Sequence, residues 1–242
     1  MALKIKTLRD ATDGRGVKLA VYGGSGVGKT TQIAAIVGSL GENDKLLIIT
    51  AEHGLLTLRQ EGLGILDDPR VLVAEVATVG ETKEAVDFAK VTSNGIVWVV
   101  VDSVSNIADR ELRAMLQAKP DPRQAYGEVM TRVPAILWGL VDVARLNVLF
   151  IFQELRDERN EGTTKTPDMV AYYGPQVPSK ALQQAMPFVF DAVLRMEILP
   201  NGERRFRTAK TNTIVAKDRS GKLDQFEPAD LAAVVAKIQG EA

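Results

Sequence analysis

The sequence predicts an α/β fold in which a mainly parallel central sheet is flanked by helices and ends in antiparallel strands. Three observations predict this fold. Strand-like runs alternate with helical patterns over the first 153 residues, three of these runs are almost continuously apolar, and a Pro-Asn-Gly turn joins two later strand-like runs. Alternating strands and helices favour a parallel sheet that is covered on both faces. The turn favours an antiparallel hairpin.

The elements of the parallel part follow one another at short intervals. Composition and alternation predict strands at 17–22, 45–51, 70–76, 95–102 and 147–153. The helical patterns between them fall at about 29–40, 80–93, 104–118 and 125–146. The runs KLLIIT, GIVWVVVD and NVLFIF are typical of central strands buried on both faces. Pro134 is expected to kink its helix or to start a new segment.

The character of the chain changes after residue 153. Residues 155–178 are polar, contain many turn formers and lack clear periodicity, which predicts a long mobile loop. Beyond it we expect strands at 191–199, 204–210 and 212–217 and a final amphipathic helix at 228–238. No repeat or linker marks a second domain. Residues 1–242 are therefore expected to form one domain with a short extension at 1–16.

Composition excludes several classes of site and of protein. The chain has 242 residues, no cysteine and one histidine, which excludes a disulfide framework and makes a transition-metal site an unexpected finding. Its length suffices for a well-buried core. The amino terminus lacks an apolar core of signal-peptide length, and no stretch approaches the ~18 apolar residues that span a bilayer. We therefore expect an intracellular protein without a membrane partner.

Residues 23–30 carry the most specific motif of the chain. They read GGSGVGKT, which fits the phosphate-binding pattern G-x-x-x-x-G-K-[ST] between a strand-like run and a helical pattern. Backbone N–H groups of such a loop converge on phosphates, Lys29 neutralises the β- and γ-phosphates, and the Thr30 hydroxyl binds Mg²⁺. The sequence thus predicts ATP and Mg²⁺ as ligands. The predicted contacts are Gly23, Gly24, Ser25, Gly26, Val27, Gly28, Lys29, Thr30 and Thr31.

Two carboxylates follow apolar strands. Asp102 ends GIVWVVVD, where phosphate-loop proteins place an acid that holds Mg²⁺; the alternative is a helix cap before Ser103. In many P-loop ATPases the catalytic glutamate directly follows this aspartate. Here serine follows Asp102, so the catalytic base must come from elsewhere. Glu52 ends the second strand-like run, and the ends of neighbouring parallel strands converge beside the phosphate loop. A carboxylate there is placed to activate a water molecule.

Taken together, the motifs resemble those of the RecA-type recombination ATPases and of the related hexameric replicative helicases. The resemblance extends from Gly23 to about Gly221 through GGSGVGKT, ITAEHG, VVVDSVS, LFIFQELR, VPSKAL and AKDRSGK, in that order. It implies a RecA-like P-loop NTPase fold. It also implies that Glu52 is the hydrolytic base and that Asp102 is the magnesium-binding acid.

Further roles are implied by the same resemblance. A polar residue after the LFIF strand senses the γ-phosphate in these proteins, and both Gln153 and Glu154 fit that position. Lys217 and Arg219 match the cations that relatives send into the nucleotide site of a neighbouring subunit. A cation placed against the developing γ-phosphate charge stabilises the transition state, and supplying it from a neighbour makes turnover depend on assembly.

Only about 16 residues precede the first core strand, so the chain most resembles the phage-encoded RecA-like ATPases that act as single-strand annealing proteins. This implies a phage protein acting in the bacterial cytoplasm. The implied partners are single-stranded DNA, further copies of the chain in a ring or filament, and a single-strand-binding protein. The alternation Lys4-Ile5-Lys6 predicts either an edge strand added to a neighbour or a frayed tail.

DNA contacts are expected within residues 155–180. Basic side chains there would meet phosphates and two tyrosines would stack on bases; these residues are Arg156, Arg159, Lys165, Tyr172, Tyr173 and Lys180. Two features oppose this interpretation: an equal number of acidic residues lies between 155 and 180, and adjacent tyrosines are also typical of loop packing. A second basic stretch at 203–222, with seven basic and two acidic residues, is alternatively a solvated hairpin face.

The sequence leaves two other functions open. A hexameric motor that translocates on DNA uses the same motifs, although no helicase amino-terminal domain precedes the core. A regulatory ATPase that binds proteins instead of DNA is consistent with the isoelectric point near 6.

Overall fold

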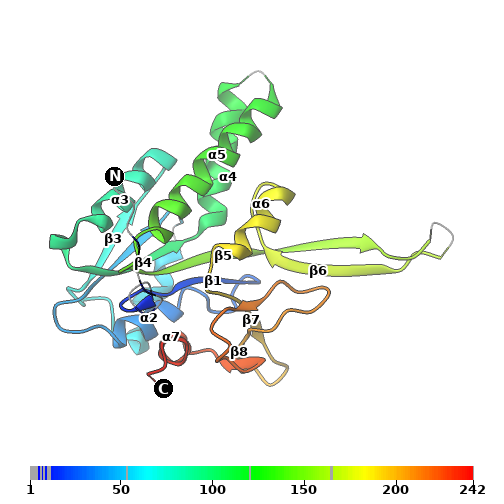
Figure 1. The fold of residues 1–242 in the computed structure, drawn as a ribbon. Coiled ribbons are helices and arrows are strands. Elements are labelled where there is room, and N and C mark those ends of the chain that lie inside the picture. Colours follow the sequence, from blue (N-terminus) through cyan, green and yellow to red (C-terminus); the bar gives the residue numbers. More distant parts are fainter. Residues whose placement is uncertain are drawn as a thin grey trace.

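A computed structural model describes residues 5, 7, 9, 12–52, 54–119, 121–163 and 166–241. They form a ten-stranded sheet flanked by helices (Figure 1). The main path runs β10-β8-β7-β1-β5-β4-β2-β3, while β6 pairs with β5 and β9 with β7. The strands are β1 Lys18–Gly23, β2 Lys45–Thr50, β3 Val71–Glu75, β4 Ile96–Asp102, β5 Asn147–Asn160, β6 Met169–Pro175, β7 Ala192–Ile198, β8 Arg204–Arg207, β9 Lys217–Asp218 and β10 Phe226–Pro228.

The predicted fold class is confirmed. Strands β7, β1, β5, β4, β2 and β3 run parallel to their neighbours, whereas β8 is antiparallel to β7 and β10 is antiparallel to β8. The antiparallel strands β8 and β10 thus lie at the carboxyl-terminal edge of the sheet, as the Pro-Asn-Gly turn predicts, while β6 is antiparallel to β5 and β9 to β7.

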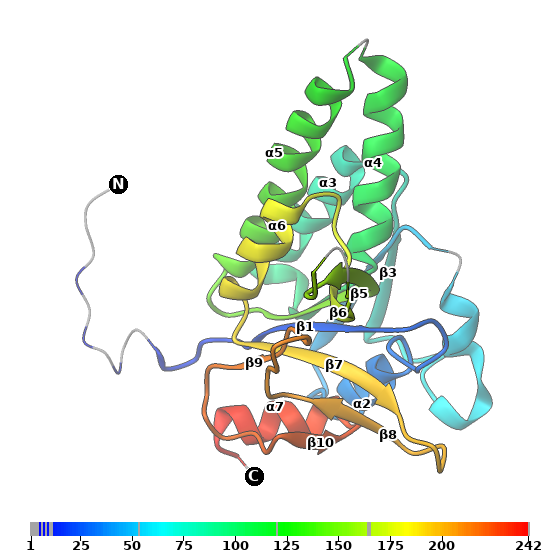
Figure 2. The ribbon, with the colours of Figure 1, turned by 90° about the vertical axis from the view of Figure 1, so that its right-hand side faces the viewer.

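Helices cover both faces of the sheet, which is why the central strands are apolar almost throughout. One face carries α3 (Val79–Lys90), α4 (Val104–Ala118), α5 (Pro122–Val141) and α6 (Lys180–Ala185), and the other carries α2 (Gln32–Gly38) and α7 (Leu231–Gln239) (Figure 2). Strand β1 shows the consequence: all six of its residues are buried, and successive side chains enter opposite clusters.

The helical hairpin α4–α5 projects from the body (Figure 1). Asp121 caps α5 by accepting a hydrogen bond from the Arg123 N–H, and Pro122 occupies the first helical turn, where its missing N–H costs nothing. Helix α5 continues through Pro134, so no new segment starts there. Among the described residues, no helix is both long enough and apolar enough to cross a bilayer.

The prediction of a loop at 155–178 is wrong. Strand β5 continues to Asn160 and pairs antiparallel with β6, from Glu154 opposite Pro175 to Asn160 opposite Met169. Residues 154–175, here called the arm, extend away from the body (Figure 1). Arg156 pairs with Glu158 at 2.7 Å and Arg159 with Asp157 at 2.9 Å. Because both faces of this strand are charged, the apolar alternation that reveals most strands is absent.

Smaller differences concern element boundaries. Helix α2 starts at residue 32 and not near 29, because residues 29–31 belong to turns. The strand expected at 212–217 reduces to β9 and an isolated bridge between Ile214 and Tyr173. His53, Lys165 and both lysines of Lys4-Ile5-Lys6 lie outside the described residues.

Candidate nucleotide site

The register of the sheet brings four segments to one edge. Gly23 lies opposite Gln153, Thr50 opposite Asp102, and Asp102 opposite Ile151. Since these strands are parallel, the segments that follow them converge at their carboxyl ends. A cleft of about 930 Å³ opens there, and it is lined by the phosphate loop, Glu52, Asp102 and Gln153. The structure thus joins residues that the sequence separates by as much as 130 positions.

The glycines of the phosphate loop serve conformation and close approach. Gly26 and Gly28 have φ values of 76° and 100°, which strain any residue with a side chain. Gly23 needs space instead, because a Cβ atom there would lie 2.6 Å from the Met196 carbonyl oxygen of β7. The loop therefore depends on glycine for two separate reasons.

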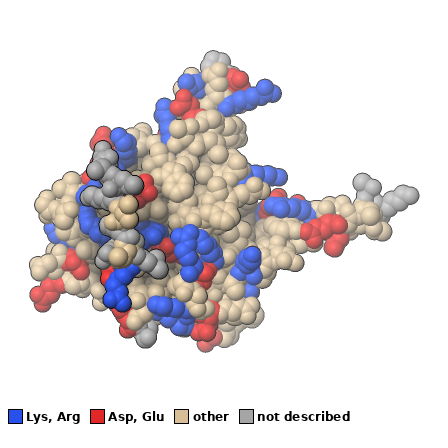
Figure 3. All heavy atoms as spheres, in the orientation of Figure 1, with Lys and Arg blue, Asp and Glu red and all other residues tan. Residues whose placement is uncertain are grey.

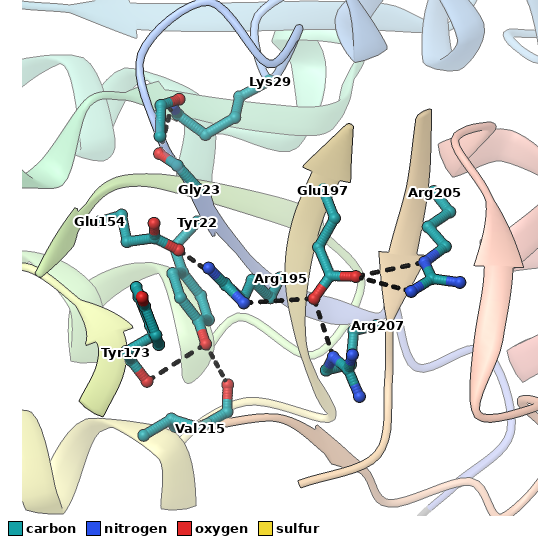
Figure 4. Close-up of polar contacts among 11 residues, drawn as sticks. Tyr22, Gly23, Lys29, Glu154, Tyr173, Arg195, Glu197, Arg205, Arg207 and Val215 are labelled. Atoms are coloured by element: carbon teal, nitrogen blue, oxygen red, sulfur yellow. Dashed lines mark hydrogen bonds and ion pairs between the residues drawn. The ribbon is translucent and has the colours of Figure 1, made fainter. Parts of the chain in front are cut away.

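Lys29 spans the phosphate loop. Its Nζ donates hydrogen bonds of 2.8 Å to the carbonyl oxygens of Gly23 and Gly24 (Figure 4). Burial lowers the pKa of Lys29 below its usual value, and the nearby carboxylates of Asp102 and Glu52 oppose that effect. The ammonium group is thus held inside the cleft by the two carbonyl oxygens.

Thr30 and Asp102, the two residues predicted to bind Mg²⁺, lie in direct contact. The Thr30 hydroxyl donates to Asp102 Oδ2 at 2.8 Å. Burial raises the pKa of Asp102 to about 6, although the Thr30 hydrogen bond lowers it. Ser103, and not Asp102, caps α4, so the capping alternative for Asp102 is wrong. Hydroxyl and carboxylate oxygens are suitable Mg²⁺ ligands, and this ion is typically completed by substrate phosphates and water. The described part of the chain has no cluster of three acidic, histidine or cysteine side chains that could hold a metal ion.

Glu52 is fixed by two side chains that sequence reasoning did not identify. Its Oε1 accepts hydrogen bonds from the Ser103 hydroxyl at 2.6 Å and from Asn106 Nδ2. Asn106 Oδ1 in turn accepts from Gln153 Nε2 at 3.3 Å, so Asn106 joins the ends of three strands. The spacing Ser103-x-x-Asn106 is the sequence pattern that could have identified this pair, because the N-cap and the third helical residue lie on the same side of the first turn.

Gln153 and Glu154 have different partners. Gln153 reaches Asn106, and its N–H donates to the Ser105 hydroxyl at 3.0 Å. Glu154 also lines the cleft but forms an ion pair with Arg195 of β7 at 2.6 Å. Geometry therefore connects Gln153 to Glu52 and connects Glu154 to the antiparallel edge of the sheet.

Figure 4 shows how that second connection continues. Arg195 pairs with Glu197 at 3.2 Å and lies 4.2 Å from the centroid of the Tyr173 ring in β6. Glu197 binds Arg205 and Arg207 of β8. A chain of ion pairs thus runs from Glu154 at the edge of the cleft to β8, and Arg195 within it also contacts Tyr173 of the arm.

Lys217 and Arg219 do not line the cleft of their own chain. Lys217 Nζ donates to the carbonyl oxygens of Pro187 at 2.9 Å and Phe190 at 2.7 Å. Arg219 pairs with Asp191 at 3.2 Å, and Asp191 also accepts a hydrogen bond from the N–H of Lys18, where β1 begins. Both cations therefore lie away from the carboxyl end of β1 that carries the phosphate loop. Their expected action on a neighbouring subunit stays a prediction.

The expected DNA-binding residues that the structure describes lie on or beside the arm. Arg156 and Arg159 form ion pairs within the arm, and Figure 3 shows basic and acidic side chains interspersed along it. Tyr172 and Tyr173 are adjacent in a strand and so point to opposite faces. Tyr172 stacks with Arg159, while Tyr173 stacks with Arg195 of the body. The two rings therefore do not form one platform.

A groove of about 670 Å³ lies between the base of the arm, α6 and residues 210–217, and we call it the arm groove. Four basic residues line it, against one acidic residue, Asp157; the basic ones are Arg159, Lys180, Lys210 and Lys217. It also contains Phe188, whose side chain is 78% exposed, in addition to both tyrosines. Lys210 and Phe188 were not predicted from the sequence because the fold alone places them beside the arm.

Comparison with known proteins supports the assignment of the chain to the P-loop ATPases. Residues 15–220 match the model of a family described as an AAA domain, AAA_24, and the chain belongs to this family. No curated protein matches. Among solved structures, a prototypical ATPase from the type III secretion system of pathogenic bacteria is similar, with a TM-score of 0.53 and 14% sequence identity. The match covers 86% of this chain but only 59% of that one. Family and fold identify a P-loop ATPase.

Proposed function

We propose that this P-loop ATPase hydrolyses ATP with Mg²⁺ and uses that cycle to bind single-stranded DNA and promote annealing or strand pairing. The observation that carries the hydrolytic part is the fixed position of Glu52 across the cleft from the phosphate loop. Of the two carboxylate oxygens of Glu52, only Oε1 accepts hydrogen bonds from described side chains. Its Oε2 is therefore available to a water molecule.

The chemistry follows from these positions. Lys29 and the loop N–H groups bind the phosphates, and Glu52 accepts a proton from water as the water oxygen bonds to the γ-phosphorus. The bond between that phosphorus and the β–γ bridging oxygen breaks, which yields ADP and inorganic phosphate. Mg²⁺ bound by Thr30 and Asp102 would neutralise phosphate charge.

Assembly supplies the remaining cations in this proposal. Lys217 and Arg219 of one subunit would reach the γ-phosphate of the next in a ring or filament. Mixing tests this directly: Glu52→Gln and Arg219→Ala chains, each inactive alone, should regain ATPase activity together. Separate inactive chains that stay inactive when mixed would contradict action on a neighbour.

The arm groove supports the DNA-binding part of the proposal. Its excess of basic side chains suits a phosphate backbone, and aromatic rings provide stacking surfaces that tolerate any sequence. Binding there would place DNA next to Tyr173, which contacts Arg195 and thereby the ion pairs that lead to Glu154. A single-strand-binding protein is a further proposed partner.

Fluorescence anisotropy of a labelled deoxythymidine oligonucleotide tests this part. The protein is titrated with ATP, with ADP, and as the Lys29→Ala variant. We expect tight binding only with ATP and its loss in the variant; annealing of two complementary labelled strands is then measured. Directional unwinding of a duplex would instead indicate a motor.

A second candidate is an ATPase that acts on proteins. The internal pairing of arm charges favours it, because paired arginines offer less attraction to phosphates. Absence of oligonucleotide binding in every nucleotide state, together with intact ATP hydrolysis, would favour this candidate over the DNA-binding one.

A further inference from the structure

Arg204 reaches the phosphate loop from the antiparallel edge of the sheet. It is the first residue of β8, and its Nε donates a 3.0 Å hydrogen bond to the carbonyl oxygen of Val27. The side chain is exposed, and it lines the nucleotide cleft although 177 positions separate it from Val27. It was grouped with the basic residues of 203–222 in the sequence, where nothing distinguishes it from its neighbours.

The structure does distinguish them. Arg205 and Arg207 pair with Glu197, and their guanidinium groups lie 3.6 and 4.6 Å from the centroid of the Phe226 ring. Arg204 forms no ion pair with any described carboxylate. Side chains alternate along a strand, so Arg204 shares a face with Phe206, which is fully buried in the cluster that contains α2. Arg204 is thus the member of the basic stretch directed toward the nucleotide.

Its approach comes from the side opposite Glu52. In the sheet order, β7 and β8 lie on one side of β1, while β4 and β2 lie on the other. In the proposed function Glu52 and Asp102 face the γ-phosphate, and Arg204 lines the cleft on the other side of the phosphate loop. A Cβ atom at Gly28 would lie 3.2 Å from Arg204 Nε and 3.4 Å from its Cδ, so the absence of a side chain at Gly28 admits the arginine.

The guanidinium retains donors for a ligand. Arginine has five N–H groups, and among the described residues only the Nε of Arg204 finds an acceptor. Both terminal nitrogens remain for paired hydrogen bonds to one phosphate, which is the arrangement that binds phosphates most strongly. The loop cradles the α- and β-phosphates while Lys29 reaches the β- and γ-phosphates, so the phosphate left for this side is the α-phosphate.

We propose that Arg204 binds the α-phosphate of the nucleotide, opposite Lys29. It thereby holds the phosphate that carries the nucleoside, whereas inorganic pyrophosphate, bound at the β and γ positions beside Lys29, needs no contact with Arg204. The inference rests on nucleotide binding at this site, but it requires neither hydrolysis nor DNA.

Isothermal titration with ADP and with pyrophosphate, both in Mg²⁺, tests the assignment. Arg204→Ala should weaken ADP binding about tenfold, since a charge-assisted pair of hydrogen bonds is lost at a partly exposed position, and should leave pyrophosphate binding unchanged. Arg204→Gln, which keeps a donor for Val27, should weaken ADP binding to the same extent. The neighbouring Arg205→Ala is the control and should alter neither ligand.

Two outcomes would overturn the proposal. Equal weakening of ADP and pyrophosphate in Arg204→Ala, with recovery in Arg204→Gln, would show that Arg204 only supports the loop through Val27. Unchanged ADP binding in both variants would show that it does not touch the nucleotide. Because neither hydrolysis nor DNA enters the measurement, failure of the proposed function leaves this result intact; a wild-type chain that bound neither ligand would overturn both.

Discussion

The nucleotide cleft and the arm are built on the same strand, β5, yet they are held in different ways. The inner half of β5, up to Phe152, is buried between helices, and the next side chain, Gln153, contacts Asn106 of α4, which also contacts Glu52. The outer half is mostly exposed, and its charged side chains pair two positions apart along the same strand. The inner half of β5 is therefore held by tertiary packing, whereas the outer half is held by pairing with β6 and by local ion pairs.

This difference assigns the two regions different roles. A cleft whose groups are oriented before a ligand arrives suits chemistry, because no reorganisation is needed in the transition state. An exposed hairpin supported mainly by its own backbone pairing is free to change partners. Glu154 and Arg195 mark the boundary, since Glu154 lines the cleft and pairs with Arg195, which also contacts Tyr173 at the base of the arm.

The largest difference between the cleft and the arm is expected from Glu52→Gln. Loss of the proposed general base should lower kcat for ATP by at least about 10²-fold while nucleotide affinity is retained. Steady-state ATPase assays and nucleotide titration measure the two quantities. Glu158→Gln, a matched change on the arm, should leave the basal ATPase rate unaffected. An equal loss of ATPase rate in that variant would contradict the different roles assigned to the cleft and the arm.

Removing the arm should produce the reverse pattern. Replacing residues 159–170 by Asn-Gly leaves Glu158 and Ala171, which are paired in the sheet, joined by a two-residue turn. We expect oligonucleotide affinity to fall about tenfold or more, because a stacking ring and nearby cations lose their support. ADP affinity should remain that of the wild type. Anisotropy measures the oligonucleotide affinity and calorimetry the ADP affinity of the same preparation. Loss of both affinities would contradict the prediction.

Asn106→Ala probes the orientation of Glu52. The substitution removes one of two donors to Glu52 Oε1 and its link to Gln153, so we expect kcat to fall about tenfold with little change in KM. A structural role alone would instead lower thermal stability without this split. Asn201→Ala, in the turn between β7 and β8, serves as the control for removing an exposed amide.

Acidification should weaken Mg²⁺-dependent nucleotide binding through Asp102. Its pKa is raised to about 6, so at pH 6 roughly half of the molecules carry a protonated carboxyl, and Mg²⁺-dependent affinity should be about twofold lower than at pH 7.5. Without ligand the sign differs: the folded state holds this proton more tightly than the unfolded chain, so the Asp102 contribution to stability declines as pH rises from about 4 to 6. Asp102→Asn should remove both dependences.

The smallest effect is expected from Arg156→Ala on the arm. Its pair with Glu158 is exposed, and such pairs contribute little to stability, so the melting temperature should change by no more than about 2 °C. Differential scanning calorimetry measures this change. A large destabilisation would show that the arm depends on its charge pairs as strongly as the cleft depends on its own.

Sequence patterns predicted the inner half of β5 and the phosphate loop because both have local causes. Continuous apolar runs report burial on two faces, and the loop needs glycines at fixed spacing. The outer half of β5 escaped prediction because Arg156, Asp157, Glu158 and Arg159 leave no apolar face. Asn106 and Arg204 escaped for another reason: their partners, Glu52 and Val27, are distant in the chain.

By itself, then, the sequence determined the fold class, the phosphate loop and the carboxylates at strand ends, since each depends on short-range geometry or on the burial of a strand. Only the tertiary structure decided which side chains support Glu52, that Tyr172 and Tyr173 have separate partners, and that Arg204 differs from Arg205. These features depend on strand order and register, which bring distant residues within hydrogen-bonding distance, and no local pattern records them.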